Sequence, residues 1–431
     1  MRFADALARL DARQPEHMPG PSLERIRAIC DLLDEPQLTY PSIHVTGTNG
    51  KSTAARVAAA VACAHDLTTG LFISPHLLEV TERLGVCDVD IDRQAFADEW
   101  EHLEPFLQHV DSMGLGGEVT YFEALTALAF LWFADKPVGL GVFEVGMGGS
   151  WDATNLVASD VAVITPIGLD HVAELGPTLA DIAAEKAGVI KAGKTAVVRS
   201  QDPEAALMLA RRADEVGAGL LHEGADWEVE ETLLAVGGQS FRLRTPRAAY
   251  EDLFLPVFGE YSVANAAAGI VAFEALTEHG LDEGALREGL TSVRAPGRLE
   301  VVGREPLIVL DGAHNPGGAA ALAAALPRTF TWERLHLVLA VSANKDVEGV
   351  VAPLAILADR VFAARYDGAR SAPAEAVSKA ARAIGAGEVV EHPSVAGAIA
   401  AARDLATPRD AIVVAGSLFT VGDAKRALAG A

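Results

Sequence analysis

The segment 44–53 contains the residue types from which a phosphate-binding loop is built. It reads His-Val-Thr-Gly-Thr-Asn-Gly-Lys-Ser-Thr, between an apolar run that predicts a buried strand and an Ala- and Val-rich run, 54–64, that predicts a helix. A glycine turn between strand and helix directs backbone N–H groups outward at the positive end of the helix dipole, where anions bind. Lys51 adds a mobile cation, and the hydroxyl of Ser52 or Thr53 can reach a metal-bound phosphate oxygen. The segment therefore predicts binding of a nucleoside triphosphate, although its glycines stand closer together than in G-x-x-x-x-G-K-[ST].

Further apolar runs predict buried strands that end in polar side chains. Ser74 ends a short run, Glu144 lies at the end of the run 138–145, and His171 follows the run 160–167. The carboxyl ends of parallel strands meet at one edge of a sheet, which is where open α/β sheets bind ligands. A carboxylate opposite a phosphate loop commonly holds Mg²⁺. We therefore expect Glu144 and His171 to bind metal, whereas Ser74 fits a metal ligand and a strand-ending turn equally well.

Lys186 stands in an unusual place for a lysine. The Ala-rich run 178–188 predicts a helix that is half-buried, and Lys186 lies within it. Burying an ammonium group is costly. The side chain therefore either extends to solvent or has its chemistry altered.

Composition limits the classes of partner. The chain has 431 residues, of which half are hydrophobic and 6% aromatic, so we expect two domains built from helices packed on parallel strands. Its net charge of −24 argues against a nucleic-acid or anionic-membrane partner, since either requires a basic surface. The longest apolar run, 127–134, is too short to span a bilayer.

The ends and the cysteines favour a cytosolic protein. Residues 1–17 carry arginines and aspartates in an amphipathic pattern, which differs from a signal peptide. Cys30, Cys63 and Cys87 lie far apart and form no C-x-x-C motif, so we expect reduced, mostly buried thiols.

The pattern of strands and helices predicts the domain boundary. A break at 294–298, which reads Arg-Ala-Pro-Gly-Arg, divides an N-terminal domain, 1–295, from a C-terminal domain, 296–431. Strands predicted in the second part end in polar segments at 311–316, 342–346 and 416–419, which indicates a second ligand-binding edge. The expected fold class is α/β, with a parallel sheet in each domain and the C-terminal domain the smaller.

Taken together in chain order, these motifs resemble the Mur ligase superfamily, and within it the folylpolyglutamate synthase/dihydrofolate synthase family. Muramyl-peptide ligases carry a UDP-binding domain before the phosphate loop, and about forty residues precede the loop here, which favours the folate family. The segments that carry the resemblance are 44–53, 73–77 with 82–83, 146–155, 170–171, 185–188, 296–298, 311–316, 345–346 and 416–419.

The resemblance implies a two-domain fold with a P-loop NTPase-like N-terminal part and a Rossmann-like C-terminal part. It also implies an ATP-dependent ligase that joins L-glutamate to dihydropteroate, to reduced folates, or to both, through an acyl phosphate. By the same resemblance Lys186 becomes carbamylated and helps a second Mg²⁺. The implied metal ligands are Ser74, Glu144, His171, Lys186 and Ser52, and the implied catalytic residues are Lys51, Lys186 and His171. The implied ATP-binding residues are Gly47, Thr48, Asn49, Gly50, Lys51, Ser52, Thr53, Asn265, Arg298, Asp311 and His314, and those for the other substrates are Phe122, Asp152, Arg83 and Ser417.

The chain departs from the family pattern at three places. Ser52 stands where the folate family usually has glycine, which leaves the metal-binding hydroxyl open. Ser150 and Trp151 replace an arginine and a bulky residue, and Tyr261 and Ser262 replace His-Gln, so the acceptor stays open. The alternatives are a ligase for another carboxylate, such as a poly-γ-glutamate or cell-wall precursor, and an ATP-binding protein without ligase activity. The resemblance favours a cytoplasmic monomer whose partners are small molecules.

Overall fold

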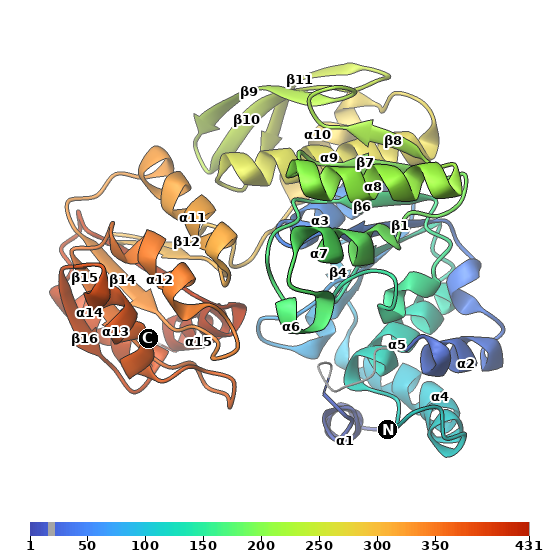
Figure 1. The fold of residues 1–431 in the computed structure, drawn as a ribbon, viewed down its shortest axis with the longest axis horizontal. Helices are drawn as coiled ribbons and strands as arrows, with labels where there is room; N and C mark the ends of the chain where they lie inside the picture. The colour runs from blue at the N-terminus through green and yellow to red at the C-terminus, as the bar shows by residue number, and fades with distance from the viewer. Residues whose placement is uncertain (16–21, 431) are drawn as a thin grey trace. The chain divides into compact units, whose positions relative to one another are not determined.

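The computed structural model describes residues 1–15 and 22–430, and the chain divides into two compact units (Figure 1). The first unit contains residues 1–232, 241–254 and 264–293, and the second contains residues 233–240, 255–263 and 294–431. The α/β fold class is confirmed, with a parallel sheet at the centre of each unit. Among the described residues, no helix combines the length and the apolar character needed to cross a membrane.

An eight-stranded sheet forms the centre of the first unit, in the order β4-β3-β2-β5-β1-β6-β7-β8. The neighbouring strands β2, β5, β1, β6, β7 and β8 pair in parallel, whereas β3 and β4 are antiparallel additions at one edge. The strands are β1 (Ser42–Thr46), β2 (Thr69–Phe72), β3 (Leu84–Val86), β4 (Val89–Asp90), β5 (Leu140–Glu144), β6 (Val161–Ile164), β7 (Thr195–Val198) and β8 (Gly219–His222).

The phosphate-loop segment leaves the middle of this sheet. β1 lies between β5 and β6, and all five of its residues are buried. α3 (Lys51–Ala64) follows at once and packs against β1, β2 and β5. Its small side chains allow this close approach, since eight of its alanines and valines are buried. The carboxyl ends of β1, β5 and β6 therefore meet at one edge, as the sequence predicts.

Helices complete the first unit, and β9, β10, β11 and α9 each contain residues of both units. α1, α2, α4 and α5 share one hydrophobic core around Trp100 and Phe130. A second sheet has the order β11-β10-β9. The remaining elements are α1 (Phe3–Asp11), α2 (Glu24–Leu32), η1 (Pro36–Leu38), η2 (Val80–Arg83), α4 (Arg93–Ser112), α5 (Tyr121–Asp135), η3 (Ala153–Leu156), α6 (Val172–Leu175), α7 (Leu179–Ala187), α8 (Pro203–Val216), β9 (Glu228–Ala235), β10 (Gly238–Arg244), β11 (Ala249–Leu255), α9 (Glu260–Thr277) and α10 (Glu283–Ser292).

Residues 294–431 of the second unit, in orange and red in Figure 1, contain a six-stranded sheet in the order β12-β13-β17-β14-β15-β16. β12 is antiparallel and the other strands are parallel. Its elements are β12 (Glu300–Arg304), β13 (Leu307–Leu310), α11 (Pro316–Thr329), β14 (Leu335–Leu339), α12 (Val347–Ala355), β15 (Arg360–Ala363), α13 (Ala374–Ala383), β16 (Glu388–Glu391), α14 (Val395–Leu405), β17 (Ala411–Ala415) and α15 (Leu418–Ala429).

The expectation for the cysteines was wrong in part. Cys63, near the end of α3, and Cys87, in the turn between β3 and β4, form a disulfide with their Cα atoms 5.6 Å apart. The hairpin folds back against the last turn of the helix, which brings together two residues that are 24 positions apart in sequence. Cys30 is a buried free thiol, as expected. The amphipathic segment 1–17 contains α1, and residues 16 and 17 lie outside the described residues.

Candidate active site

The loop between β1 and α3 is held against the segment that follows β6. The backbone N–H of Thr48 donates to the carbonyl oxygen of Pro166 at 3.0 Å, and the Thr48 side chain exchanges hydrogen bonds with the backbone of Gly168. Gly47 has φ +141°, and a Cβ atom there would lie 1.9 Å from Thr165 Oγ1. Gly50, the residue before α3, has φ +93°. Both glycines are therefore required by the backbone conformation and by lack of space.

Glu144 is held beside two serines. Its side chain is buried, Ser52 Oγ donates to Glu144 Oε1 at 3.0 Å, and the Ser74 backbone N–H donates to Glu144 Oε2 at 3.3 Å. These three predicted metal ligands come from α3, the loop after β2 and the end of β5. All three side chains carry oxygen atoms, which is the ligand type that Mg²⁺ prefers, and the Ser74 contact with Glu144 is through its backbone N–H.

Lys186 reaches the phosphate loop from α7. Its side chain is 4% exposed, and its Nζ donates to the carbonyl oxygen of Gly47 at 2.9 Å. Lys51 Nζ donates to the same oxygen at 3.2 Å. Burial, followed by the charge of Lys51, lowers the pKa of Lys186 to about 7. The lysine is therefore buried, which excludes the interpretation that it extends to solvent.

The glycine-rich turn after β5 is anchored on both sides. Thr46 Oγ1 donates to the Gly148 carbonyl at 2.8 Å, and one carboxylate oxygen of Glu185 accepts from the N–H groups of Gly149 and Trp151. A Cβ at Gly149 would lie 2.8 Å from the Lys186 carbonyl oxygen. The turn and α7 therefore need this glycine to pack closely.

Asp152 is buried and already accepts several hydrogen bonds. The Met147 N–H donates to one carboxylate oxygen, and the N–H and hydroxyl of Thr154 donate to the other. Burial raises the pKa of Asp152 to about 6. The Thr154 hydroxyl also contacts Nε2 of the buried His44 at 2.8 Å, and burial lowers the pKa of His44 well below its usual value. His44 is therefore neutral and donates to Thr154, which holds Asp152 in place.

Two other predicted substrate residues lie on neighbouring elements. Phe122 is buried at the start of α5 next to Phe72, and a Cβ at Gly146 would lie 2.6 Å from its ring. Arg83 is buried, its Nε donates to His76 Nδ1 at 3.0 Å, and its guanidinium lies over the Tyr121 ring. Both side chains are fixed by packing.

His171 stands in the segment after β6 with φ +51°, at the residue before α6. Its backbone N–H donates to Asp170 Oδ1 at 2.9 Å, and its Nε2 lies 4.0 Å from the same oxygen. The carboxylate of Asp170 is mostly buried and also favours the charged form of Lys186.

The second unit gathers the predicted residues that surround the end of β13. Asp311 is buried and accepts from the N–H groups of Leu299 and Ala313, each at 2.8 Å. Burial raises the pKa of Asp311, and the charge of Arg298 acts in the opposite direction. His314 Nδ1 contacts the Gly312 carbonyl oxygen at 3.1 Å. Ser417, on the neighbouring β17–α15 connection, caps α15.

Comparisons with known proteins agree with this geometry. The Mur ligase middle domain matches residues 45–273, and the Mur ligase glutamate ligase domain matches residues 297–418. The dihydrofolate synthase/folylpolyglutamate synthase of Mycobacterium tuberculosis is 38% identical over 96% of this chain and 92% of its own length. The solved structure of Mycobacterium tuberculosis folylpolyglutamate synthase complexed with ADP has a TM-score of 0.95 and 37% identity, and the match covers 100% of this chain and 98% of that one. The structure of Escherichia coli FolC in complex with DHPP and ADP has a TM-score of 0.88 and 30% identity, with 100% of this chain and 98% of that one covered.

The chain belongs to the Mur ligase family, in its dihydrofolate synthase/folylpolyglutamate synthase group. The family that the sequence predicts is therefore confirmed, and so is the prediction of an ATP-dependent ligase of this type. The roles of single residues in this ligase stay predictions.

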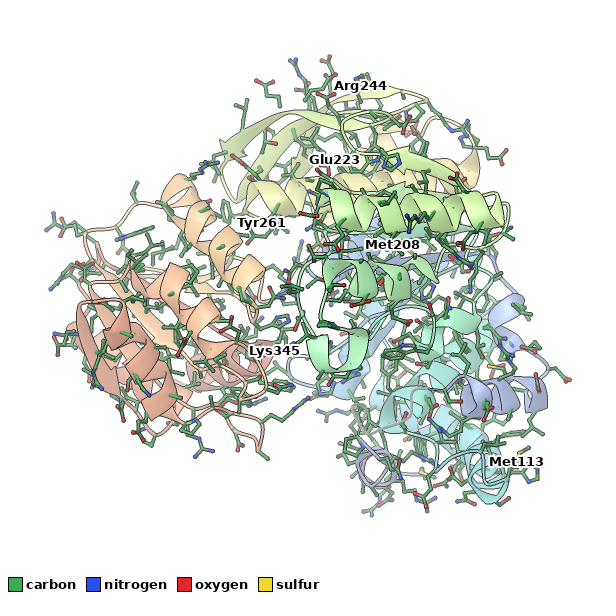
Figure 2. All side chains as sticks on the ribbon, viewed as in Figure 1. Met113, Met208, Glu223, Arg244, Tyr261 and Lys345 are labelled. Carbon is green, nitrogen blue, oxygen red and sulfur yellow. A yellow bond between two sulfur atoms is a disulfide. The ribbon has the colours of Figure 1, made fainter. Side chains whose placement is uncertain are left out.

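Arg199 and Glu223, which the sequence patterns do not predict as site residues, support the predicted ATP-binding residue Asn265. Arg199, after β7, donates to the side-chain oxygen of Asn265, and Glu223 (Figure 2) holds Arg199 by an ion pair of 2.7 Å. Asn265 is buried and lies next to Gly50, where a Cβ would lie 2.2 Å from its side-chain nitrogen. The end of a strand at Arg199 was the available signal, but the apolar pattern of residues 194–245 mixes strand and helix periods.

Proposed function

We propose that this Mur ligase forms an amide bond between the amine of L-glutamate and the carboxylate of dihydropteroate, of reduced folates, or of both. The observation that carries the proposal is the convergence of Lys51, Lys186 and Gly47 beside the buried Glu144, in a chain that matches folate ligases over almost its whole length. Relatives that share this fold have been solved with ADP and with DHPP.

The phosphate loop would prepare ATP for the first step. Gly47 and Gly50 shape the loop, Lys51 supplies a cation for the β- and γ-phosphates, the start of α3 supplies backbone N–H groups, and Ser52 and Thr53 add hydroxyls. The N–H groups of Thr48 and Asn49 donate to the Pro166 carbonyl and hold the loop in place. The carboxylate oxygen of the acceptor attacks the γ-phosphorus, ADP leaves, and an acyl phosphate forms. Lys51 places positive charge where negative charge develops, so positioning and charge neutralisation provide most of the rate enhancement.

The second step forms the amide bond. The amine of L-glutamate attacks the acyl carbon, and the tetrahedral intermediate expels inorganic phosphate. The Lys51 cation beside Gly47 also stabilises the charge of this leaving group.

We propose that Ser52, Ser74, Glu144 and His171 bind Mg²⁺. The proposal that these residues fit Mg²⁺ rests on the buried Glu144 carboxylate. One of its oxygens accepts a hydrogen bond from Ser52 and the other accepts one from Ser74. When bound, Mg²⁺ supplies charge neutralisation at the triphosphate.

For Lys186 we propose carbamylation, which replaces the ammonium by an anionic oxygen ligand for a second metal ion. Burial makes the neutral amine accessible near pH 7, and the neutral amine is the form that reacts with CO₂. The product removes the repulsion between the buried Lys186 and the half-buried Lys51. Lys186, Lys51 and His171 are then the proposed catalytic residues.

Other proposed contacts follow the resemblance. Phe122 stacks on the pterin ring and Asp152 accepts hydrogen bonds from it, while Arg83 and Ser417 contact the remaining substrate groups. Asn265, Arg298, Asp311 and His314 bind the nucleotide. We further propose that the ligase is cytoplasmic, since its proposed substrates are available inside the cell, and that it is a monomer, as the family resemblance implies.

Phosphate release from Mg-ATP and L-glutamate tests the function. Dihydropteroate and tetrahydrofolate are compared as acceptors, and we expect release with at least one of them. Release with dihydropteroate alone identifies a dihydrofolate synthase, and release with both identifies a bifunctional enzyme. If neither acceptor supports release while ATP still binds, the folate proposal is wrong and another carboxylate is the acceptor.

A further inference from the structure

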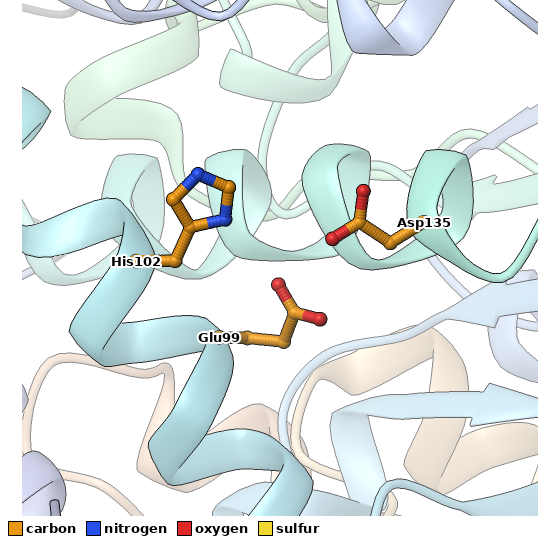
Figure 3. A group of neighbouring side chains, drawn as sticks. All are labelled: Glu99, His102 and Asp135. Atoms are coloured by element: carbon orange, nitrogen blue, oxygen red, sulfur yellow. The ribbon is translucent and has the colours of Figure 1, made fainter.

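A second group of potential metal ligands lies outside the ligase site. Glu99 and His102 stand one turn apart on α4, and Asp135 is the last residue of α5 (Figure 3). Each side chain offers one ligand atom, and these atoms all lie within 4.8 Å of one another. Residues three positions apart share one face of a helix, so both α4 side chains face Asp135.

The charges of this cluster are poorly balanced without a cation. Glu99 Oε2 is a buried atom without a hydrogen-bond partner among the described residues, and the Glu99 carboxylate is directed between His102 and Asp135 (Figure 3). The Asp135 carboxylate repels that of Glu99, Asp98 adds to this repulsion, and Lys136 opposes it.

The position of Asp135 at the end of α5 also favours a bound cation. A helix ends with unpaired carbonyl groups and a partial negative charge, which disfavours a carboxylate there. Asp135 ends α5 at such a position, next to the buried oxygen of Glu99. A cation bound between the three side chains would neutralise both carboxylates and the end of the helix.

We propose that Glu99, His102 and Asp135 bind a divalent transition-metal ion such as Zn²⁺. One imidazole nitrogen with two carboxylate oxygens is a typical donor set for Zn²⁺. His102 and Asp135 are exposed, so water completes the coordination. The ion links the middle of α4 to the end of α5. Phe122 is the second residue of α5, at the opposite end of that helix. The role of the ion is to hold these two helices together.

Zinc titration of the full-length, chelator-treated protein by calorimetry tests the proposal. We compare the wild type with Glu99→Gln, His102→Gln and the matched control His109→Gln, which changes an exposed histidine two turns further along α4. The wild type and His109→Gln should bind one more equivalent of Zn²⁺ than His102→Gln and Glu99→Gln, or bind it at least tenfold more tightly. Equal stoichiometry and affinity in all four proteins would overturn the proposal, and so would a loss in His109→Gln alone.

A second measurement separates this site from metal bound in the ligase site. The absorption of Co²⁺-loaded wild type minus that of Co²⁺-loaded His102→Gln should contain d–d bands of a histidine-bound ion. Zn²⁺ should also raise the melting temperature of the wild type and of His109→Gln, but not that of Asp135→Asn. A flat difference spectrum together with equal melting shifts would show that the cluster binds no transition metal.

Discussion

Lys51 Nζ and Lys186 Nζ both donate a hydrogen bond to the carbonyl oxygen of Gly47. One lysine begins α3 and the other lies near the end of α7, 135 positions later (186 − 51). Two ammonium groups on one acceptor repel each other, and the more buried of the two has its pKa lowered to about 7. An anionic group at this place would relieve the repulsion, which supports the proposals that Lys51 binds phosphate and that Lys186 is modified.

Replacing Lys186 by methionine should stabilise the protein at acidic pH and abolish catalysis. Below pH 7 the lysine is charged in both the folded and the unfolded state, and the full cost of burying the charge is present. Between pH 7 and 10.5 the unfolded state binds more protons, so wild-type stability rises with pH. The shift from 10.5 to about 7 corresponds to at most about 5 kcal/mol. Urea unfolding at pH 6 and 9 measures this, with Lys379→Met on an exposed face as control. Equal pH dependence of Lys186→Met and wild type would contradict the prediction.

Ligase activity should depend on dissolved CO₂ if Lys186 is carbamylated. Enzyme kept in CO₂-free buffer at pH 6, where the carbamate is lost, should regain activity when bicarbonate is added at pH 8. The ¹³C spectrum after incubation with ¹³C-bicarbonate should contain a carbamate signal that is missing from Lys186→Met. Full activity in CO₂-free buffer would leave Lys186 as an unmodified amine.

Changing Glu144 to glutamine should weaken the response to Mg²⁺. The substitution keeps the size of the side chain but removes the charge between Ser52 and Ser74. We expect kcat/KM to fall about a hundredfold or more, since charge neutralisation at the triphosphate is a large part of the catalysis. The measurement is phosphate release as a function of Mg²⁺ concentration. Ser52→Ala should raise the Mg²⁺ requirement and Ser52→Thr should restore it, whereas an unchanged requirement in Glu144→Gln would exclude this carboxylate as a ligand.

Gly47→Ala should displace the phosphate loop. The new Cβ would meet Thr165 Oγ1 at 1.9 Å and the Thr165 carbonyl oxygen at 2.8 Å, and φ +141° is strained for alanine. We expect a loss of about 1–3 kcal/mol in stability and loss of ATP binding. Thermal melting and nucleotide titration measure both effects. Gly168→Ala is the matched control, because a Cβ there has no neighbour within 4 Å. Similar behaviour of the two variants would mean that crowding at Gly47 is unimportant.

Reducing the disulfide should lower stability without removing the fold. Cys63 and Cys87 are 24 positions apart, and closing such a loop constrains the unfolded chain by about 3 kcal/mol. Urea unfolding with and without dithiothreitol measures the difference. Cys63→Ser should match the reduced wild type and show no further response to the reductant. A reductant effect of the same size in Cys63→Ser would assign it to another cause.

Local patterns in the sequence determined the phosphate loop and the strands around it. The apolar run before Thr46 and the small residues after Lys51 specify strand, turn and helix within a few positions, so 44–53 was recognisable by itself. Glu144 was recognisable for the same reason, since it ends a continuous apolar run. The order of such motifs along the chain was enough to predict the family and the fold class.

Only the tertiary structure decided which distant groups meet. The shared acceptor of Lys51 and Lys186, the ion pair that holds Arg199 beside Asn265, and the disulfide of Cys63 depend on how helices pack on the sheet. Periodicity reports the buried face of one element and carries no information on its neighbours. Edge strands such as β12 and β16 also went unpredicted, because a strand with one open side has a weaker apolar pattern. Sequence thus provided the chemical groups, and packing placed them at one edge of the sheet.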